Sequence, residues 1–126
     1  MKVLLDTHIF LWAVSEPEKL PVSYRSILDS LANECLVSSV SISEIMIKCS
    51  IGKLDCPFNP VEEVKEAGFE LIPFNGEDAL PLKDLPFHHR DPFDRMLIAQ
   101  SMTRGLQIMT CNAKFSAYNC SVLEIS

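Results

Sequence analysis

Short apolar runs alternate with longer segments of helical periodicity along almost the whole chain, and this alternation constrains the fold more than any other feature. The runs expected to form strands are residues 2–5, 35–38, 69–73, 106–109 and 122–125. The helices expected between them are residues 7–14, 22–32, 41–51, 61–67, 77–82 and 92–103. Strands that alternate with helices form a parallel sheet covered on both faces. We therefore predict an α/β fold with a central parallel sheet of about four or five strands.

The composition is that of a single globular domain spanning residues 1–126, because 48% of the residues are hydrophobic and 22% are charged. Acidic residues outnumber basic residues by 17 to 11, so the formal net charge is −6. This balance disfavours a fold that holds nucleic acid by a broad basic face. An acidic chain can still act on nucleic acid when a bound metal ion supplies the positive charge.

The five cysteines favour a reduced, cytoplasmic protein. Their number is odd and no two have C-x-x-C spacing, which gives no basis for a zinc ribbon or a redox pair. The amino terminus has some features of a secretion signal, but Asp6 and His8 interrupt it, and the apolar stretch that follows is too short to cross a membrane. We expect neither a signal peptide nor a membrane span.

Carboxylates follow the first two expected strands, at the end of a parallel sheet where binding sites usually form. Asp6 ends the first strand, and Asp6 or Thr7 can cap the next helix without excluding a metal-binding role for Asp6. Glu44 lies in the third helix, where Ser41 and Glu44 form a capping-box pattern and Lys48 is four residues further on. Each of these residues therefore has a structural interpretation beside the functional one.

The last long helix opens with a second acidic pair. Asp91 fits the N-cap position, Pro92 fits the first helical position, and Asp94 lies in the first turn. Two carboxylates three residues apart share one helix face and carry more negative charge than a single cap requires. Of the two, Asp91 is better explained as the cap than as a ligand. Asn112 follows the fourth expected strand and is either a turn residue or a further oxygen ligand.

Together, the oxygen atoms after these strands form the ligand set that hard divalent cations such as Mg²⁺ or Mn²⁺ prefer. The three histidines, His8, His88 and His89, lack zinc-binding spacing and are expected at the surface or in loops. The sequence has only four glycines and contains no Walker, G-x-S-x-G or dinucleotide motif. A loop that cradles phosphate therefore has little support.

Several segments form a recognisable family pattern that spans nearly the whole chain. They are residues 4–8 (LLDTH), residues 43–45 (SEI) with Lys48, residues 52–54 (GKL), residues 89–100 (HRDPFDRMLIAQ), and Thr110 with Asn112. In these segments the chain resembles PIN-domain proteins, specifically VapC-type toxins of toxin–antitoxin pairs. The resemblance implies a central parallel sheet with helices on both sides. It also implies an Mg²⁺-dependent endoribonuclease that hydrolyses RNA phosphodiester bonds.

The resemblance assigns expected roles to individual residues. The first three acids of the family correspond to Asp6, Glu44 and Asp94, which form the expected catalytic and metal-binding set. Asp6 and Asp94 are expected to bind the metal directly, and Glu44 is expected to bind it through water or to steer the nucleophile. The fourth acid of the family follows a threonine by two residues, and here that position is Asn112, which offers a carbonyl oxygen but no charge. Thr110 is expected to orient a ligand or to contact phosphate.

The resemblance also implies partners: an RNA substrate, a cognate antitoxin laid over the acidic cleft, and a second copy of the chain in a homodimer. The helix expected at residues 7–14 is apolar nearly all round, which indicates either a core helix or an interface. An acidic toxin suits a basic antitoxin segment. Four basic residues lie near the motifs: Lys48, Arg90, Arg95 and Lys114. Each is expected either to contact the RNA backbone or to lie at a solvated helix end.

Three other functions compete with the ribonuclease. A PIN module weakened by Asn112 would bind RNA or a protein partner without cleavage. A phosphotransferase or dehalogenase-like hydrolase also has an aspartate after its first strand, but it needs a second aspartate where this chain has His8. An antitoxin-like binding protein has no support, because the sequence contains no basic or helix-turn-helix-like segment.

Overall fold

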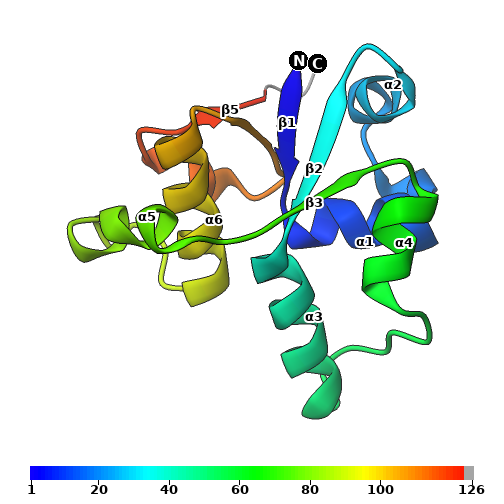
Figure 1. The fold of residues 1–126 in the computed structure, drawn as a ribbon, viewed down its shortest axis with the longest axis horizontal. Coiled ribbons are helices and arrows are strands. Elements are labelled where there is room, and N and C mark those ends of the chain that lie inside the picture. Colours follow the sequence, from blue (N-terminus) through cyan, green and yellow to red (C-terminus); the bar gives the residue numbers. More distant parts are fainter. Residues whose placement is uncertain (124–126) are drawn as a thin grey trace.

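The computed structural model describes residues 1–123, in which five parallel strands form one sheet (Figure 1). The strand order is β3-β2-β1-β4-β5, so the first strand of the chain lies in the middle. The strands are β1 (Lys2–Leu5), β2 (Glu34–Ser38), β3 (Glu70–Ile72), β4 (Gln107–Met109) and β5 (Ser121–Val122). All neighbouring strands pair in parallel, which confirms the predicted α/β fold and brings every carboxyl end to the same edge.

Helices connect the strands and cover both faces of the sheet. The α-helices are α1 (Thr7–Ser15), α2 (Val22–Asp29), α3 (Ser39–Ser50), α4 (Pro60–Glu66), α5 (Gly76–Ala79) and α6 (Pro92–Arg104). The 3₁₀ helices are η1 (Pro17–Lys19), η2 (Leu80–Lys83) and η3 (Ala113–Ala117). Figure 1 shows α1, α2 and α4 on the opposite side of the central strands from α5 and α6. Within residues 1–123, no helix has both the length and the apolar character needed to cross a membrane.

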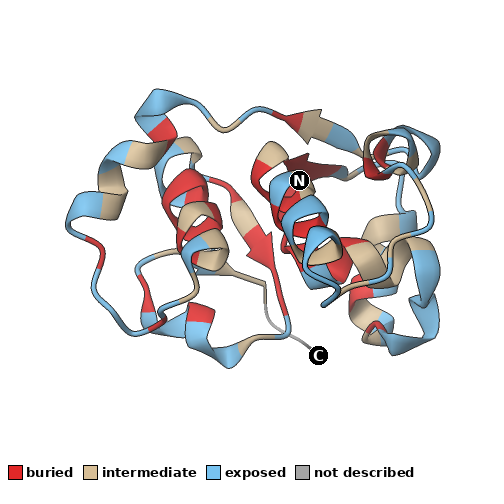
Figure 2. Ribbon diagram, turned by 90° about the horizontal axis from the view of Figure 1, so that it is seen from below, coloured by how far each residue is buried: buried red, intermediate tan, exposed pale blue. Residues whose placement is uncertain are grey.

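The central strand divides the core into two apolar clusters, because its side chains alternate between the faces of the sheet. Val3 and Leu5 pack on one face with Ile9 and Phe10 of α1, whereas Leu4 packs on the other face against α6. Figure 2 shows buried residues concentrated in the strands and in the helices that cover them. Ile9 and Phe10 are completely buried, which confirms that α1 contributes to the core.

The helix expected at residues 41–51 is α3, and it begins two residues earlier because Ser38 caps it. The Ser38 hydroxyl accepts a hydrogen bond from the Val40 N–H at 3.1 Å. The predicted capping box of Ser41 and Glu44 is therefore wrong. Both residues lie inside the helix and are buried, so their side chains are available for contacts with other elements.

Three other elements differ more clearly from the prediction, whereas the remaining boundaries agree to within one residue. The second helix ends at Asp29, because the Ser30 hydroxyl accepts a hydrogen bond from the amide two residues on and turns the chain, which leaves Leu31 fully exposed. The segment at residues 77–82 is the short helix α5 followed by the proline-containing helix η2. Residues 124 and 125 of the strand expected at residues 122–125 lie outside the described residues, and β5 spans Ser121–Val122.

Candidate active site

Asp6 stands where the central strand β1 ends and α1 begins. Its Oδ1 accepts a hydrogen bond from the Ile9 N–H at 2.8 Å, and its Oδ2 accepts one from Thr110 Oγ1 at 2.5 Å. The first bond makes Asp6 the N-cap of α1, which confirms the structural role considered for it. The cap also holds this buried carboxylate at the carboxyl edge of the sheet, beside the end of β4.

Glu44 reaches the same edge from the second turn of α3 and is almost completely buried. Thr7 Oγ1 donates a hydrogen bond to Glu44 Oε1 at 2.6 Å and lies 2.9 Å from Ser41 Oγ. Lys48 forms the predicted i,i+4 ion pair with Glu44 Oε2. The consecutive residues Asp6 and Thr7 therefore contact β4 and α3 respectively. The contact by which Thr7 orients Glu44 joins residues 37 positions apart, and no local sequence pattern indicates it.

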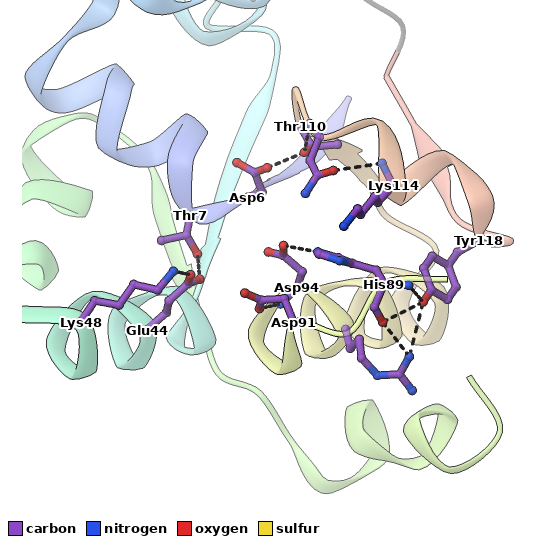
Figure 3. A network of polar contacts seen from close by, with 12 residues as sticks. Asp6, Thr7, Glu44, Lys48, His89, Asp91, Asp94, Thr110, Lys114 and Tyr118 are labelled. Carbon is purple, nitrogen blue, oxygen red and sulfur yellow. Dashed lines mark hydrogen bonds and ion pairs between the residues drawn. The ribbon is translucent and has the colours of Figure 1, made fainter. Parts of the chain in front are cut away.

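The amino terminus of α6 brings the second acidic pair to this edge. Asp91 Oδ1 accepts a hydrogen bond from the Asp94 N–H at 2.9 Å, which confirms Asp91 as the N-cap. Asp94 Oδ2 lies 2.7 Å from Nε2 of His89. No hydrogen bond to Asp94 Oδ1 is formed within residues 1–123. Figure 3 shows Asp91 and Asp94 together beside Asp6, with Glu44 next to them on α3.

The carboxylates influence one another electrostatically. Burial raises the pKa of Asp6 from 3.8 to about 6, and the negative charge of Asp94 raises it as well, while the hydrogen bond from Thr110 acts in the opposite direction. Burial also raises the pKa of Asp94, and the charges of Asp91 and Glu44 add to that effect. Negative charges therefore repel one another here, where little water screens them. A site of this kind is stabilised by a cation.

The donor chemistry of this edge fits a hard divalent cation, because the acidic side chains offer only oxygen atoms. In the arrangement described for residues 1–123, no three His, Cys, Asp or Glu side chains form a group that would hold a metal ion. Each carboxylate is bound to a neighbour of its own, in the pairs Asp6–Thr110, Glu44–Lys48 and Asp94–His89. Metal binding by Asp6, Glu44 and Asp94 therefore stays a prediction.

Thr110 and Asn112 form the remaining side of the site, at the end of β4. Thr110 Oγ1 donates to Asp6 and accepts a hydrogen bond from the Asn112 N–H at 3.0 Å. Asn112 Oδ1 accepts a hydrogen bond from the Lys114 N–H at 3.0 Å, so it caps the helix η3. Asn112 is therefore the N-cap of η3, two residues after the threonine that contacts Asp6, whereas the sequence predicted a turn residue or an oxygen ligand.

Two side chains of the motif before α6 are placed differently from the expectation. His89 lies in a loop as expected, but it is buried against Asp94 instead of lying at the surface. Arg95 was considered as an RNA-backbone contact, and it is buried beneath the same loop, where it donates to the carbonyl oxygens of Leu85 and Pro86. Arg95 is therefore not available to RNA. The sequence signal for both placements is that His89 and Arg95 lie in the family segment at residues 89–100.

The PIN domain family model matches residues 3–119, so the chain belongs to the PIN domain family. Solved structures with the same fold cover nearly the full length of both chains. VapBC2 from Rickettsia felis, bound to a DNA fragment from its promoter, aligns with a TM-score of 0.74 and 20% identity, covering 98% of each chain. DNA-bound VapBC from Salmonella typhimurium aligns with a TM-score of 0.67 and 14% identity, covering 98% of this chain and 97% of the other.

A third structure belongs to the VapBC family of toxin–antitoxin systems. VapBC-5 from Mycobacterium tuberculosis aligns with a TM-score of 0.59 and 16% identity, covering 97% of this chain and 95% of the other. A search of curated proteins gave no match. At these identities the structural likenesses establish the fold, and the family model establishes the family.

We expect Asp6→Asn to stabilise the protein at neutral pH by roughly 1–3 kcal/mol, because a shift from 3.8 to about 6 disfavours the charged carboxylate in the folded state. The unfolded chain loses the Asp6 proton first, so wild-type stability should fall as the pH rises from about 4 to about 6 and then level off. Urea unfolding of both proteins at pH 4 and pH 7.5 measures this difference.

The exposed residue Asp84 supplies the control, because Asp84→Asn should leave the unfolding free energy within about 0.5 kcal/mol of wild type at both pH values. An Asp6→Asn protein that is less stable than wild type at pH 7.5 would contradict the conclusion that the charged Asp6 carboxylate is destabilising.

Proposed function

We propose that this PIN-domain protein is an Mg²⁺-dependent endoribonuclease toxin of a type II toxin–antitoxin system. One observation carries the proposal: three carboxylates from different elements, Asp6, Glu44 and Asp94, lie at the carboxyl edge of the sheet, where the charge of Asp94 helps to raise the pKa of Asp6 and the charge of Glu44 helps to raise the pKa of Asp94. Charge repulsion of this kind favours a bound cation. The likeness to VapBC structures supports assigning this site to the toxin of such a pair.

The proposed reaction is hydrolysis of a phosphodiester bond in RNA. Mg²⁺, or Mn²⁺ in its place, would supply positive charge for the phosphate oxygens and lower the pKa of a coordinated water. Asp6 and Asp94 would hold the ion. Thr110 keeps the Asp6 carboxylate in one orientation through its hydrogen bond. Glu44, held by Thr7 and Lys48, would steer the attacking water or accept its proton.

Purified protein should cleave RNA in the presence of Mg²⁺ and lose this activity when EDTA is added. Asp94→Asn should reduce cleavage to background, because an amide cannot supply the negative charge expected of a direct metal ligand. Asp84→Asn, at an exposed position between η2 and α6, should cleave like wild type. Gel analysis of a labelled RNA measures all three proteins, and cleavage that persists in EDTA would exclude the metal-dependent mechanism.

The second candidate function is a PIN module that binds RNA or a protein partner without cleaving RNA. The observation that favours it is Asn112, which leaves the site without a carboxylate at the fourth position and uses its side-chain oxygen to cap η3. RNA binding by wild type without Mg²⁺-dependent cleavage would favour this alternative over the ribonuclease.

Asn112→Asp should tighten Mg²⁺ binding by roughly tenfold. A further carboxylate about 4 Å from a divalent ion contributes about 1–2 kcal/mol in a partly solvated cleft. The substitution keeps the oxygen that accepts from Lys114 N–H, so the cap of η3 is preserved. A Mg²⁺ titration of RNA cleavage should show a lower midpoint with a smaller change at saturation. An unchanged midpoint would mean that Asn112 acts only as a cap.

The proposed protein partner is an antitoxin segment that carries apolar and basic side chains. A groove beside the acidic site is lined by Leu11, Trp12, Leu54 and Phe58, and we call it the α1 groove. Its rim carries acidic residues, which are Glu16, Asp55 and Glu63. Leu11 and Leu54 also line the adjoining cavity that contains Glu44 and Asp91. A single extended segment can therefore follow the groove to the acidic site, with charge complementarity at both ends.

Leu54→Lys should abolish co-purification with a co-expressed cognate antitoxin, because a cation would then lie in the apolar part of the α1 groove. Leu31→Lys is the matched control, since Leu31 is fully exposed after α2 and lines no part of that groove. Tagged pull-downs of wild type and both variants measure the association. Equal recovery with Leu54→Lys would exclude the groove as the antitoxin site.

We also propose a homodimer, for which the carboxyl-terminal half of α3 offers an apolar surface. Met46, Ile47 and Ile51 are each between 42% and 59% exposed.

Light scattering should give twice the mass of one chain. Ile47→Lys should shift the mass towards one chain, whereas Val22→Lys, at an exposed position on α2, should not. A wild-type mass of one chain at tens of micromolar would exclude the dimer.

A further inference from the structure

The loop between η2 and α6 is held by two buried side chains from other elements. Arg95 Nη2 donates to Leu85 O at 2.9 Å, and Arg95 Nη1 donates to Pro86 O at 2.8 Å and to His89 O at 3.2 Å. The Tyr118 hydroxyl donates to Pro86 O at 2.6 Å and accepts from the His89 N–H at 2.8 Å. Both ends of this short loop are thus tied to α6 and to the segment after η3.

The burial of Arg95 shows how strongly this loop is constrained. Its residue surface is only 6% exposed, and within residues 1–123 no carboxylate forms an ion pair with it. A buried guanidinium needs hydrogen-bond acceptors, and here backbone carbonyl oxygens of the loop accept hydrogen bonds from Nη1 and Nη2. The cation therefore binds the loop backbone and fixes its course.

The constrained loop places one polar side chain against the acidic site. The ring of His89 is buried, packs 6.1 Å from the ring of Phe115, and has Nε2 2.7 Å from Asp94 Oδ2 (Figure 3). The Nε2–H donates to this oxygen in both the cationic ring and the neutral Nε2–H tautomer. The bond occupies one oxygen of Asp94 and leaves Oδ1 free of other hydrogen bonds in the described chain.

We propose that His89 is a positioning residue for Asp94: it fixes the carboxylate so that Oδ1 is presented to a divalent cation. The inference rests on the proposed metal-binding role of Asp94. Ligating carboxylates are commonly oriented by an outer hydrogen bond, and loss of that bond typically weakens metal binding by about 10- to 100-fold. Tyr118 and Arg95 act one step further away, because they hold the backbone of His89 in place.

The test compares variants that differ in whether a donor can reach Asp94. His89→Leu removes the donor but keeps an apolar side chain against Phe115. His89→Gln places an amide N–H at about the reach of Nε2, whereas the shorter side chain of His89→Asn does not reach Asp94. His88→Leu is the matched control, because the neighbouring His88 is exposed and contacts the ring of Tyr118 instead of an acid.

Mn²⁺ binding is measured directly by electron paramagnetic resonance of the free ion, and the Mg²⁺ midpoint of RNA cleavage is measured in parallel. We expect His89→Leu and His89→Asn to weaken Mn²⁺ binding by about 10- to 100-fold. His89→Gln and His88→Leu should stay within about threefold of wild type. Circular dichroism verifies that each variant is folded. If His89→Leu does not fold, the Mn²⁺ affinities of His89→Gln and His89→Asn are compared to test the positioning role.

The failure of this inference is distinguishable from failure of the proposed function. If wild type binds Mn²⁺ and His89→Leu or His89→Asn binds it with the same affinity, the positioning role is overturned. The proposed ribonuclease function would still stand. Equal weakening in the Gln and Asn variants would also overturn it, because a restored donor would then have no effect. A wild-type protein that neither binds Mn²⁺ nor cleaves RNA would overturn both proposals.

Discussion

The peptide unit that joins Asp6 to Thr7 holds the candidate site together, because it ends the central strand and begins the first helix. Asp6 accepts a hydrogen bond from Thr110 at the end of β4, and the next residue donates one to Glu44 on α3. The backbone reinforces the same junction, since Asp6 N–H donates to Met109 O at 3.0 Å. Two adjacent side chains thus connect the end of β1 with residues that lie 37 and 104 positions further along the chain.

The arrangement of acids at this edge opposes the stability of the fold. Burial and mutual repulsion make charged Asp6 and Asp94 unfavourable, although hydrogen bonds from Thr110 and His89 offset part of the effect. The surrounding core must supply the difference, and it does so with completely buried side chains on both faces of β1. Strain concentrated at one edge and compensated elsewhere is typical of functional sites.

The segment that leads into α6 and forms its first turn shows how one short motif serves the fold and the site together. Asp91 caps the helix, Asp94 faces the other acids, and Arg95 turns inward to bind the preceding loop. The Phe87 ring lies 4.0 Å from the Arg95 guanidinium carbon, so the buried cation also has an aromatic contact. The same loop holds the His89 ring in contact with Asp94. Each residue of the motif therefore has a distinct physical task.

The sequence by itself determined the α/β class, the parallel sheet and the acids that reach its edge, because strand and helix periodicities and the residues after each strand are local properties. The caps at Asp6 and Asp91 were predictable for the same reason. Only the tertiary structure decided that Thr7 binds Glu44 and that His89 and Arg95 are buried. These outcomes depend on which side chains distant elements bring into contact, and no local pattern encodes that pairing.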